Sequence, residues 1–171
     1  MADTQQHLLP ESLVELAGRV ISENAAAGRT VALAESCTGG LVTAALTEIP
    51  GSSAVVNCGY VTYSNQAKID AVNVSEELIE TFGAVSVAVA WAMARGALAR
   101  SGADIAVAIT GVAGPDGGTD EKPVGTVVFA RALKDQKETD IDAEQKQFGS
   151  TLSRAELRLL AAQTALELLL P

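Results

Sequence analysis

The order of apolar segments constrains the fold of this chain more than any other feature of its sequence. Short runs of small and β-branched apolar residues alternate with longer segments whose apolar residues recur at helical spacing. The runs expected to be strands are 30–34, 54–63, 104–110, 125–133 and 139–148. Because helical segments separate the first three, they favour parallel pairing, whereas the last two favour an antiparallel hairpin. The pattern therefore predicts an α/β fold, a three-layer α/β/α sandwich with a mixed, mostly parallel sheet of about five or six strands.

Six segments carry helix signals, and several begin or end at a residue that commonly caps helices. They are 13–27, 39–47, 66–71, 76–81, 87–101 and 154–170. Asn65, Ser75 and Ser86 precede three of them as N-caps. No linker or internal repeat interrupts the chain. We therefore expect a single domain over residues 10–171, preceded by a mobile N-terminal tail of residues 1–9.

The composition excludes several classes of function. A formal net charge of −9 disfavours binding to nucleic acid and to anionic membranes. The sequence shows neither a signal-peptide pattern nor an apolar stretch long enough to span a bilayer, so we expect a cytoplasmic protein. Cys37 and Cys58 lack the spacing of metal ligands, and we predict no metal and no cofactor. His7, the only histidine, lies in the expected tail, which argues against a Ser-His-Asp or Cys-His catalytic site.

The first group of residues suited to chemistry follows the run 30–34. Ser36, Thr38, Gly39 and Gly40 lie where an apolar strand gives way to a helix, and ligands bind at the carboxyl ends of parallel strands. The glycines would let a ligand approach the backbone, and N–H groups at a helix start can bind an anion. The alternative is that the serine and the threonine only cap the helix, which is a common arrangement.

The second group follows the next expected strand. With Asn65 as N-cap, Lys68 falls in the first helical turn, where the helix dipole is unfavourable for a cation. Partial burial there would lower the pKa of the lysine, and a neutral lysine can act as a general base toward a serine hydroxyl. Tyr63 could then donate or relay a proton. The alternative is a solvated lysine beside a tyrosine at the edge of the core.

The third group is the glycine-dense segment 110–118, which contains Thr110, Gly111 and Gly114. It matches neither G-x-G-x-x-G nor a Walker A sequence. Its successive N–H groups could form an anion-binding nest, or the segment could be a long hairpin connection. Arg154 and Arg158 fall one turn apart near the start of the last expected helix, where the pattern alone places them on a solvated face.

Six segments, taken in order, resemble the motifs of one family. They are 34–40, 50–53, 59–65 with Lys68, 83–86, 108–115 and 122–126, and they resemble the CinA C-terminal domain, the PncC or nicotinamide mononucleotide deamidase family. The resemblance implies a three-layer α/β/α sandwich that hydrolyses the carboxamide of nicotinamide mononucleotide to the acid and ammonia. The chain departs from the family before the last helix, where residues 149–154 stand in place of the usual Gly-Asp-Arg: the aspartate is missing and extra residues lie between Gly149 and Arg154.

The resemblance also implies roles for individual residues. Ser36 matches the nucleophile, Lys68 the group that activates it, and Tyr63 an assisting tyrosine. The residues that it places around the substrate are Thr38, Gly39, Gly40, Ser53, Thr110, Gly111, Gly114 and, for the phosphate, Arg154. The implied partner is a small-molecule nucleotide substrate, and a homodimer is compatible with the Ala- and Leu-rich composition.

Four alternatives stay open at the level of the sequence. Ser53 rather than Ser36 could be the nucleophile, and Lys68 could activate water instead of a serine. The chain could also be a non-catalytic module that binds a nucleotide or a partner associated with competence or DNA damage. Finally, it could hydrolyse a different small amide on the same scaffold.

Overall fold

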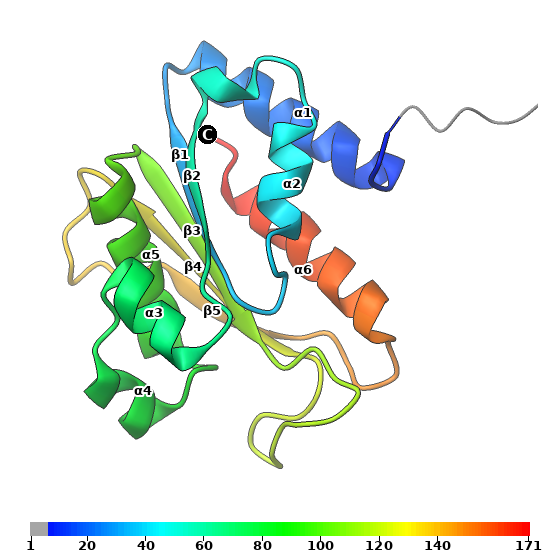
Figure 1. Cartoon of the computed structure of the whole chain (residues 1–171), viewed down its shortest axis with the longest axis vertical. Helices are drawn as coiled ribbons and strands as arrows, with labels where there is room; N and C mark the ends of the chain where they lie inside the picture. Colours follow the sequence, from blue (N-terminus) through cyan, green and yellow to red (C-terminus); the bar gives the residue numbers. More distant parts are fainter. Residues whose placement is uncertain (1–6) are drawn as a thin grey trace, which may run out of the picture.

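The computed structural model describes residues 7–171 and confirms the α/β fold (Figure 1). The core of the fold is one five-stranded sheet with the order β2-β1-β3-β4-β5. The strands are β1 Val31–Glu35, β2 Val56–Val61, β3 Ile105–Gly111, β4 Thr126–Leu133 and β5 Ala143–Gln147. The expected tail 1–9 lies largely outside the described residues, which begin at His7.

The sheet is mixed, but the prediction that it would be mostly parallel is wrong. β1 pairs parallel with β2 and β3, whereas β3–β4 and β4–β5 are antiparallel. A parallel pair needs a crossover, usually a helix, between its strands. No helix separates β3 from β4 or β4 from β5, so the chain turns back at each of these connections.

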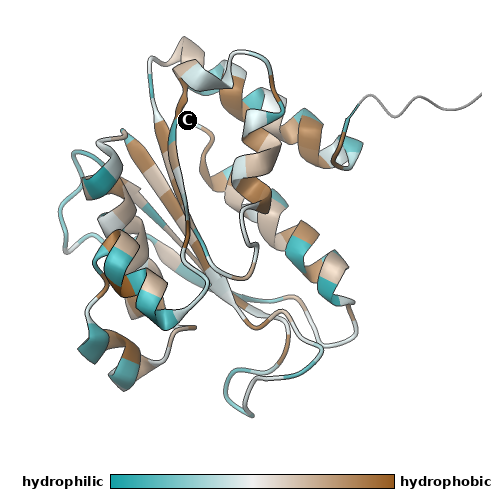
Figure 2. Ribbon diagram, viewed as in Figure 1, coloured by the Kyte–Doolittle hydropathy of each residue, from teal (hydrophilic) through white to brown (hydrophobic). Residues whose placement is uncertain are grey.

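Helices cover both faces of the sheet (Figure 1). They are α1 Glu11–Ala26, α2 Leu41–Thr47, α3 Asn65–Val72, α4 Glu76–Phe82, α5 Val87–Ser101 and α6 Arg154–Leu168. Helices α1, α2 and α6 share a buried cluster with one face, and α3, α4 and α5 share a second cluster with the other. Hydrophobic residues are concentrated in the strands of the sheet and recur along the helices that cover it (Figure 2). None of the helices in the described part of the chain is long and apolar enough to cross a membrane.

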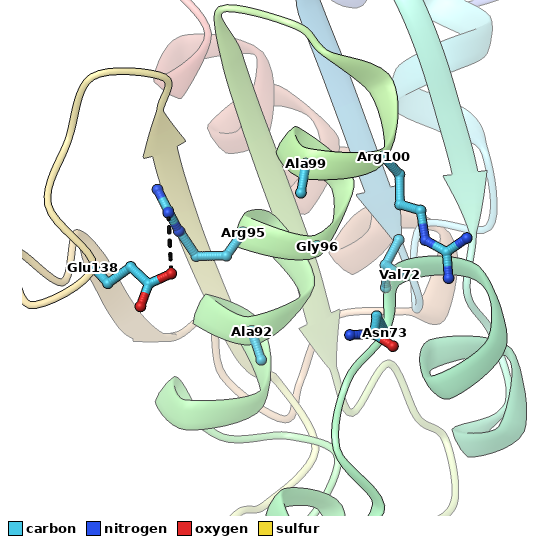
Figure 3. A pocket seen from close by; sticks show the side chains of 8 residues that line it. All are labelled: Val72, Asn73, Ala92, Arg95, Gly96, Ala99, Arg100 and Glu138. Atoms are coloured by element: carbon cyan, nitrogen blue, oxygen red, sulfur yellow. Dashed lines mark hydrogen bonds and ion pairs between the residues drawn. The ribbon is translucent and has the colours of Figure 1, made fainter.

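The two faces of β1 differ in the size of their side chains, and this difference sets how closely the helices approach. Val31 and Leu33 pack toward α1, α2 and α6, whereas Ala32 and Ala34 belong to the cluster of α5. On the α5 side, Gly96 permits a further close approach, because a Cβ at that position would collide with the carbonyl oxygen of Val72 at the end of α3 (Figure 3). Small residues thus bring α3 close to α5.

Serine side chains start four of the helices. Ser64, Ser75, Ser86 and Ser153 each accept a hydrogen bond from a backbone N–H of the following turn. Ser64 is the N-cap of α3, so the prediction that Asn65 would cap it is off by one residue. This change leaves Lys68 at the end of the first turn, as expected.

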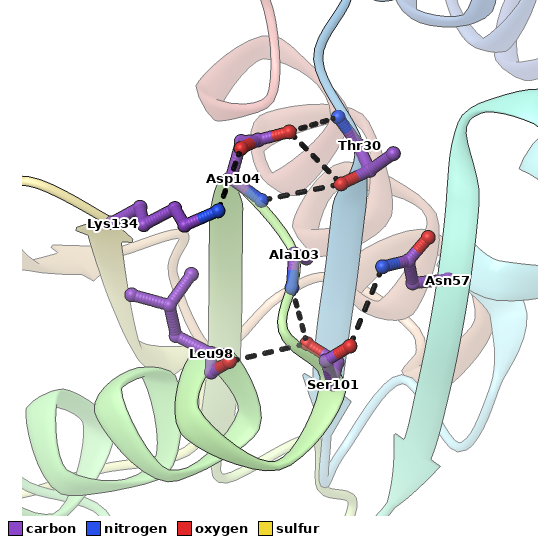
Figure 4. A network of polar contacts seen from close by, with 7 residues as sticks. All are labelled: Thr30, Asn57, Leu98, Ser101, Ala103, Asp104 and Lys134. Atoms are coloured by element: carbon purple, nitrogen blue, oxygen red, sulfur yellow. Dashed lines mark hydrogen bonds and ion pairs between the residues drawn. The ribbon is translucent and has the colours of Figure 1, made fainter.

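The amino ends of β1 and β3 are tied together by a polar network (Figure 4). Asp104 Oδ2 accepts hydrogen bonds from the backbone N–H and the hydroxyl of Thr30, at 2.8 and 3.0 Å. These bonds hold the pKa of the Asp104 carboxyl below its usual value, with Lys134 nearby as a further cause. The network fixes the sheet at the edge opposite to the carboxyl ends of the parallel strands.

Candidate active site

The carboxyl ends of β1, β2 and β3 bring three of the predicted groups to one edge of the sheet. The register pairs Glu35 of β1 with Val61 of β2 and with Ile109 of β3. The residues that follow these strands are therefore neighbours, although they are far apart in the sequence. Ser36 N–H extends the ladder by donating to Ile109 O at 2.9 Å, and Thr62 N–H donates to Glu35 O at 2.7 Å.

Lys68 and Ser36 meet at this edge. The Nζ atom of Lys68 lies 3.1 Å from Ser36 Oγ, 2.9 Å from the carbonyl oxygen of Thr62 and 3.4 Å from that of Tyr63. The Lys68 residue is only 1% exposed and Ser36 only 8%. The alternative of a solvated lysine is excluded, and the structure brings together the serine and lysine singled out from the sequence.

Burial sets the charge state of this lysine. Among residues 7–171 no carboxylate pairs with it; its polar contacts are a hydroxyl and two carbonyl oxygens. Desolvation therefore lowers the pKa of Lys68 below its usual value. A neutral amine has two N–H donors and one lone pair. The carbonyls of Thr62 and Tyr63 can take the two donors, which leaves the lone pair for the hydroxyl of Ser36.

Glu35 is a residue of this site that the sequence analysis missed. It is fully buried, and its carboxylate accepts from the N–H groups of Gly40, Val42 and Thr43 and from the Thr43 hydroxyl, at 2.7–3.1 Å. The start of α2, where the sequence suggested an anion-binding site, is thus occupied by a carboxylate of the chain itself. A glutamate at the end of a wholly apolar strand was the only signal that could have identified it.

Two arginines from the first turns of α6 reach the same edge. Arg158 Nε and Nη2 donate to the carbonyl oxygens of Cys37 and Thr38, at 3.1 and 2.9 Å. Arg154 donates to the carbonyl of Gly114 at 2.7 Å and to the Tyr63 hydroxyl at 3.0 Å. These contacts tie α6 to the loops after β1, β2 and β3. Arg158 is therefore half-buried and bonded, rather than on a solvated face.

Tyr63 lies at the rim of the site. Its side chain is 60% exposed, and its hydroxyl is bonded to Arg154, whereas its carbonyl oxygen is the part that faces Lys68. Thr110 is buried, and its hydroxyl donates a hydrogen bond to the carbonyl oxygen of Ala84 at 2.9 Å, which fixes the segment before α5. Gly111 ends β3, and Gly114, with its positive φ of 70°, begins the loop that Arg154 contacts.

Other candidates lie apart from the Ser36–Lys68 pair. Ser53 is exposed in a 3₁₀ turn, Ser52–Ala54, before β2, and so lies at the opposite edge of the parallel strands. Cys37 follows Ser36 but is buried, and burial raises the pKa of its thiol to about 11. His7 lies 3.7 Å from Glu48 at the far end of α2. Within one chain, Ser36 rather than Ser53 is therefore the serine that lies beside Lys68.

A separate hollow on the outer side of α5 is unrelated to this edge. It has a volume of about 590 Å³, and Arg95, Arg100, Asn73 and Glu138 are among its lining residues (Figure 3). Arg95 is directed to Glu138, at 3.5 Å. None of the residues that the sequence or the resemblance proposed for a site lines this hollow.

The fold and the site define an α/β domain with a serine–lysine pair at the carboxyl edge of its parallel strands. The profile of the CinA C-terminal domain matches residues 13–171, and the chain belongs to this family. The domain resembles the crystal structure of competence/damage inducible protein CihA from Agrobacterium tumefaciens, with a TM-score of 0.89 and 49% identity over 95% of this chain and 96% of that one. A CinA superfamily protein from Escherichia coli has a TM-score of 0.85 and 34% identity, with 95% and 92% covered.

Longer proteins contain similar sequences. A CinA-like protein of Mycolicibacterium gilvum is 64% identical over 109 residues, which are 64% of this chain and 26% of that protein. A CinA-like protein of Geotalea uraniireducens is 50% identical over 140 residues, 82% of this chain and 32% of its own length. The chain thus spans about a third or less of these relatives.

Proposed function

We propose that the chain is a nicotinamide-nucleotide amidohydrolase, which converts nicotinamide mononucleotide to nicotinic acid mononucleotide and ammonia. The observation that carries the proposal is the buried contact of 3.1 Å between Lys68 Nζ and Ser36 Oγ. A nucleophile within hydrogen-bonding distance of a base is the arrangement that amide hydrolysis needs. The choice of this nucleotide rests on the family resemblance.

The reaction would begin with transfer of the Ser36 hydroxyl proton to neutral Lys68. The Ser36 Oγ atom then forms a bond to the carboxamide carbon, and the carbonyl oxygen becomes an oxyanion. Lys68 returns the proton to the leaving nitrogen, so that the C–N bond breaks and ammonia departs. A water molecule, deprotonated by the same amine, attacks the resulting ester, releases the carboxylic acid and restores the serine.

Backbone N–H groups would stabilise the oxyanion. The N–H groups of Cys37 and Thr38 belong to the two residues after Ser36, and neither donates to another residue within residues 7–171. A donor from the residue after the nucleophile is a common part of an oxyanion hole.

The charge around the site suits an anionic substrate. Arg154 and Arg158 both reach this edge in a chain whose net charge is −9. Arg154 is the more exposed of the two and lies at the rim beside Tyr63, so we propose it as the group that meets the phosphate.

The test is ammonia release from nicotinamide mononucleotide by the wild type, Ser36→Ala and Lys68→Ala. Free nicotinamide and asparagine serve as control substrates, and Ser53→Ala serves as the matched serine control. We expect wild-type turnover restricted to the nucleotide, a loss of about 10³-fold or more in both site variants, and little change in Ser53→Ala. A folded wild type that binds the nucleotide and releases no ammonia would leave a non-catalytic binding module in place of the enzyme.

A further inference from the structure

The turn that carries Ser36 has its carbonyl groups held by donors. Arg158 reaches across from α6 to the carbonyl oxygens of Cys37 and Thr38, at 3.1 and 2.9 Å. The carbonyl of Ser36 accepts from Gly39 N–H at 3.0 Å. Three successive carbonyl groups of the turn are therefore fixed in direction.

The direction of a carbonyl group fixes the direction of the next N–H group. A peptide unit is planar and trans, so its N–H points opposite to its C=O. The N–H of Thr38 must point away from Arg158, and that of Cys37 must point away from Gly39 N–H. Glu35 accepts from N–H groups farther along, at Gly40 and in α2. The N–H groups of Cys37 and Thr38 are therefore the donors of the turn that bond to no other residue among residues 7–171.

A third polar group lies in the same turn. The Thr38 hydroxyl oxygen is buried and has no hydrogen-bond partner in the described part of the chain. Buried polar groups in proteins are normally paired, so an unpaired one points to a partner that the described chain does not supply. The two N–H groups of the turn that bond to no other residue, directly after a candidate nucleophile, are donors of the kind that stabilise a developing negative charge on oxygen.

We propose that Arg158 is a positioning residue. By holding the peptide between Cys37 and Thr38, it directs the N–H groups of Cys37 and Thr38 to stabilise the oxyanion of the reaction at Ser36. The inference rests on the proposed function for its nucleophile. Arg158 does not touch the substrate. Its guanidinium polarises the peptide from the carbonyl side and prevents the peptide from flipping. The forked guanidinium matters because it bonds two carbonyls at once, which one ammonium cannot reproduce.

The experiment measures how fast a small fluorophosphonate labels Ser36, because this reaction needs the nucleophile and the oxyanion donors but no nucleotide. The phosphorus–Oγ bond forms, fluoride leaves, and the serine proton passes to Lys68. Labelling is followed by intact-protein mass spectrometry for the wild type, Arg158→Gln and Arg158→Lys, with Ser36→Ala as the blank. Arg131→Gln, which removes a 2.7 Å ion pair with Asp142 between β4 and β5, is the matched control.

We expect Arg158→Gln to slow labelling by about 10- to 100-fold, Arg158→Lys to be intermediate, and the control to stay within about 2-fold. With the nucleotide, kcat should fall by a similar factor at unchanged KM. In a further variant, Arg158→Ala, added guanidinium ion should restore part of the lost labelling rate. Unchanged labelling in Arg158→Gln, equal slowing in the control, or a raised KM at constant kcat would each overturn the inference.

The two proposals fail in different ways. If the wild type is labelled at Ser36 but releases no ammonia from nicotinamide mononucleotide, the proposed function is wrong, and the ratio of labelling rates still decides the role of Arg158. If the wild type is not labelled, Ser36 is not a nucleophile and the positioning role of Arg158 is overturned with it.

Discussion

The Nζ atom of Lys68 lies 3.1 Å from the Oγ atom of Ser36, although 32 residues separate the two in the chain. Ser36 follows β1, and Lys68 ends the first turn of the helix that follows β2, the parallel neighbour of β1. The contact therefore depends on parallel pairing, on the Ser64 cap of α3 and on the close packing of α3 against α5.

Activity should rise with pH as Lys68 loses its proton. Burial lowers the pKa of this amine, and only the neutral form can accept the proton of Ser36. We expect the acid limb of the kcat/KM profile for ammonia release to have its midpoint below the ordinary lysine value of about 10.4. The profile is measured at every pH at which the protein stays folded. A kcat/KM profile with no acid limb in that range would count against Lys68 as the base.

The same pKa shift should appear in the stability of the protein. Between the lowered pKa of Lys68 in the folded protein and the ordinary lysine pKa of about 10.4, the unfolded chain keeps a proton that the folded chain has released. The free energy of unfolding therefore rises with pH across this range. Lys68→Met lacks this dependence. In urea titrations, we expect the stability of the wild type to increase relative to that of Lys68→Met as pH rises from neutral toward 10. A constant difference between the two proteins would show that the pKa of Lys68 is not lowered.

Glu35→Gln should destabilise the fold. An amide has one acceptor oxygen and would direct its NH₂ group toward N–H donors that the carboxylate now satisfies. We expect a loss of about 2–4 kcal/mol in the free energy of unfolding by urea. Glu23→Gln, which removes an exposed pair with Arg19, is the control and should cost less than about 0.5 kcal/mol. Equal effects of the two substitutions would refute the role given to Glu35.

Tyr63 and Arg154 should act as a unit. The Tyr63 hydroxyl accepts from Arg154 at 3.0 Å and makes no hydrogen bond to Ser36 or Lys68. We expect Tyr63→Phe and Arg154→Gln each to raise KM more than they lower kcat. The double variant should be less impaired than the sum of both, with a coupling of about 0.5–1 kcal/mol. A large kcat loss confined to Tyr63→Phe would instead support a direct proton-transfer role.

Cys37 should react slowly with alkylating agents despite its place beside Ser36. Burial raises the pKa of its thiol to about 11, so the reactive thiolate is scarce near neutral pH. Iodoacetamide labelling of the native protein, located by peptide mass spectrometry, should modify the half-buried Cys58 before Cys37. In urea both cysteines should react at similar rates. Rapid native labelling of Cys37 would contradict this order.

Local patterns predicted most helices and strands well. Helix α5 covers the predicted residues 87–101, because Ser86 caps its start and Gly102 its end. The predicted strand 54–63 was too long, since a 3₁₀ turn replaces its first residues. The antiparallel pairing of β3 with β4 could not be predicted from these patterns. A glycine-rich loop between two strands is compatible with a crossover to a parallel strand and with a return to an antiparallel one.

The sequence by itself determined the family, the order of the elements, and the serine and lysine suited to chemistry, since these depend on residue types at fixed spacings. Only the tertiary structure decided which groups meet. It placed Ser53 at the opposite edge, joined Tyr63 to Arg154, and filled the start of α2 with the carboxylate of Glu35. It also turned Arg158 inward to the turn after Ser36. These contacts join residues distant in the chain, and their geometry follows from strand register and helix packing rather than from local spacing.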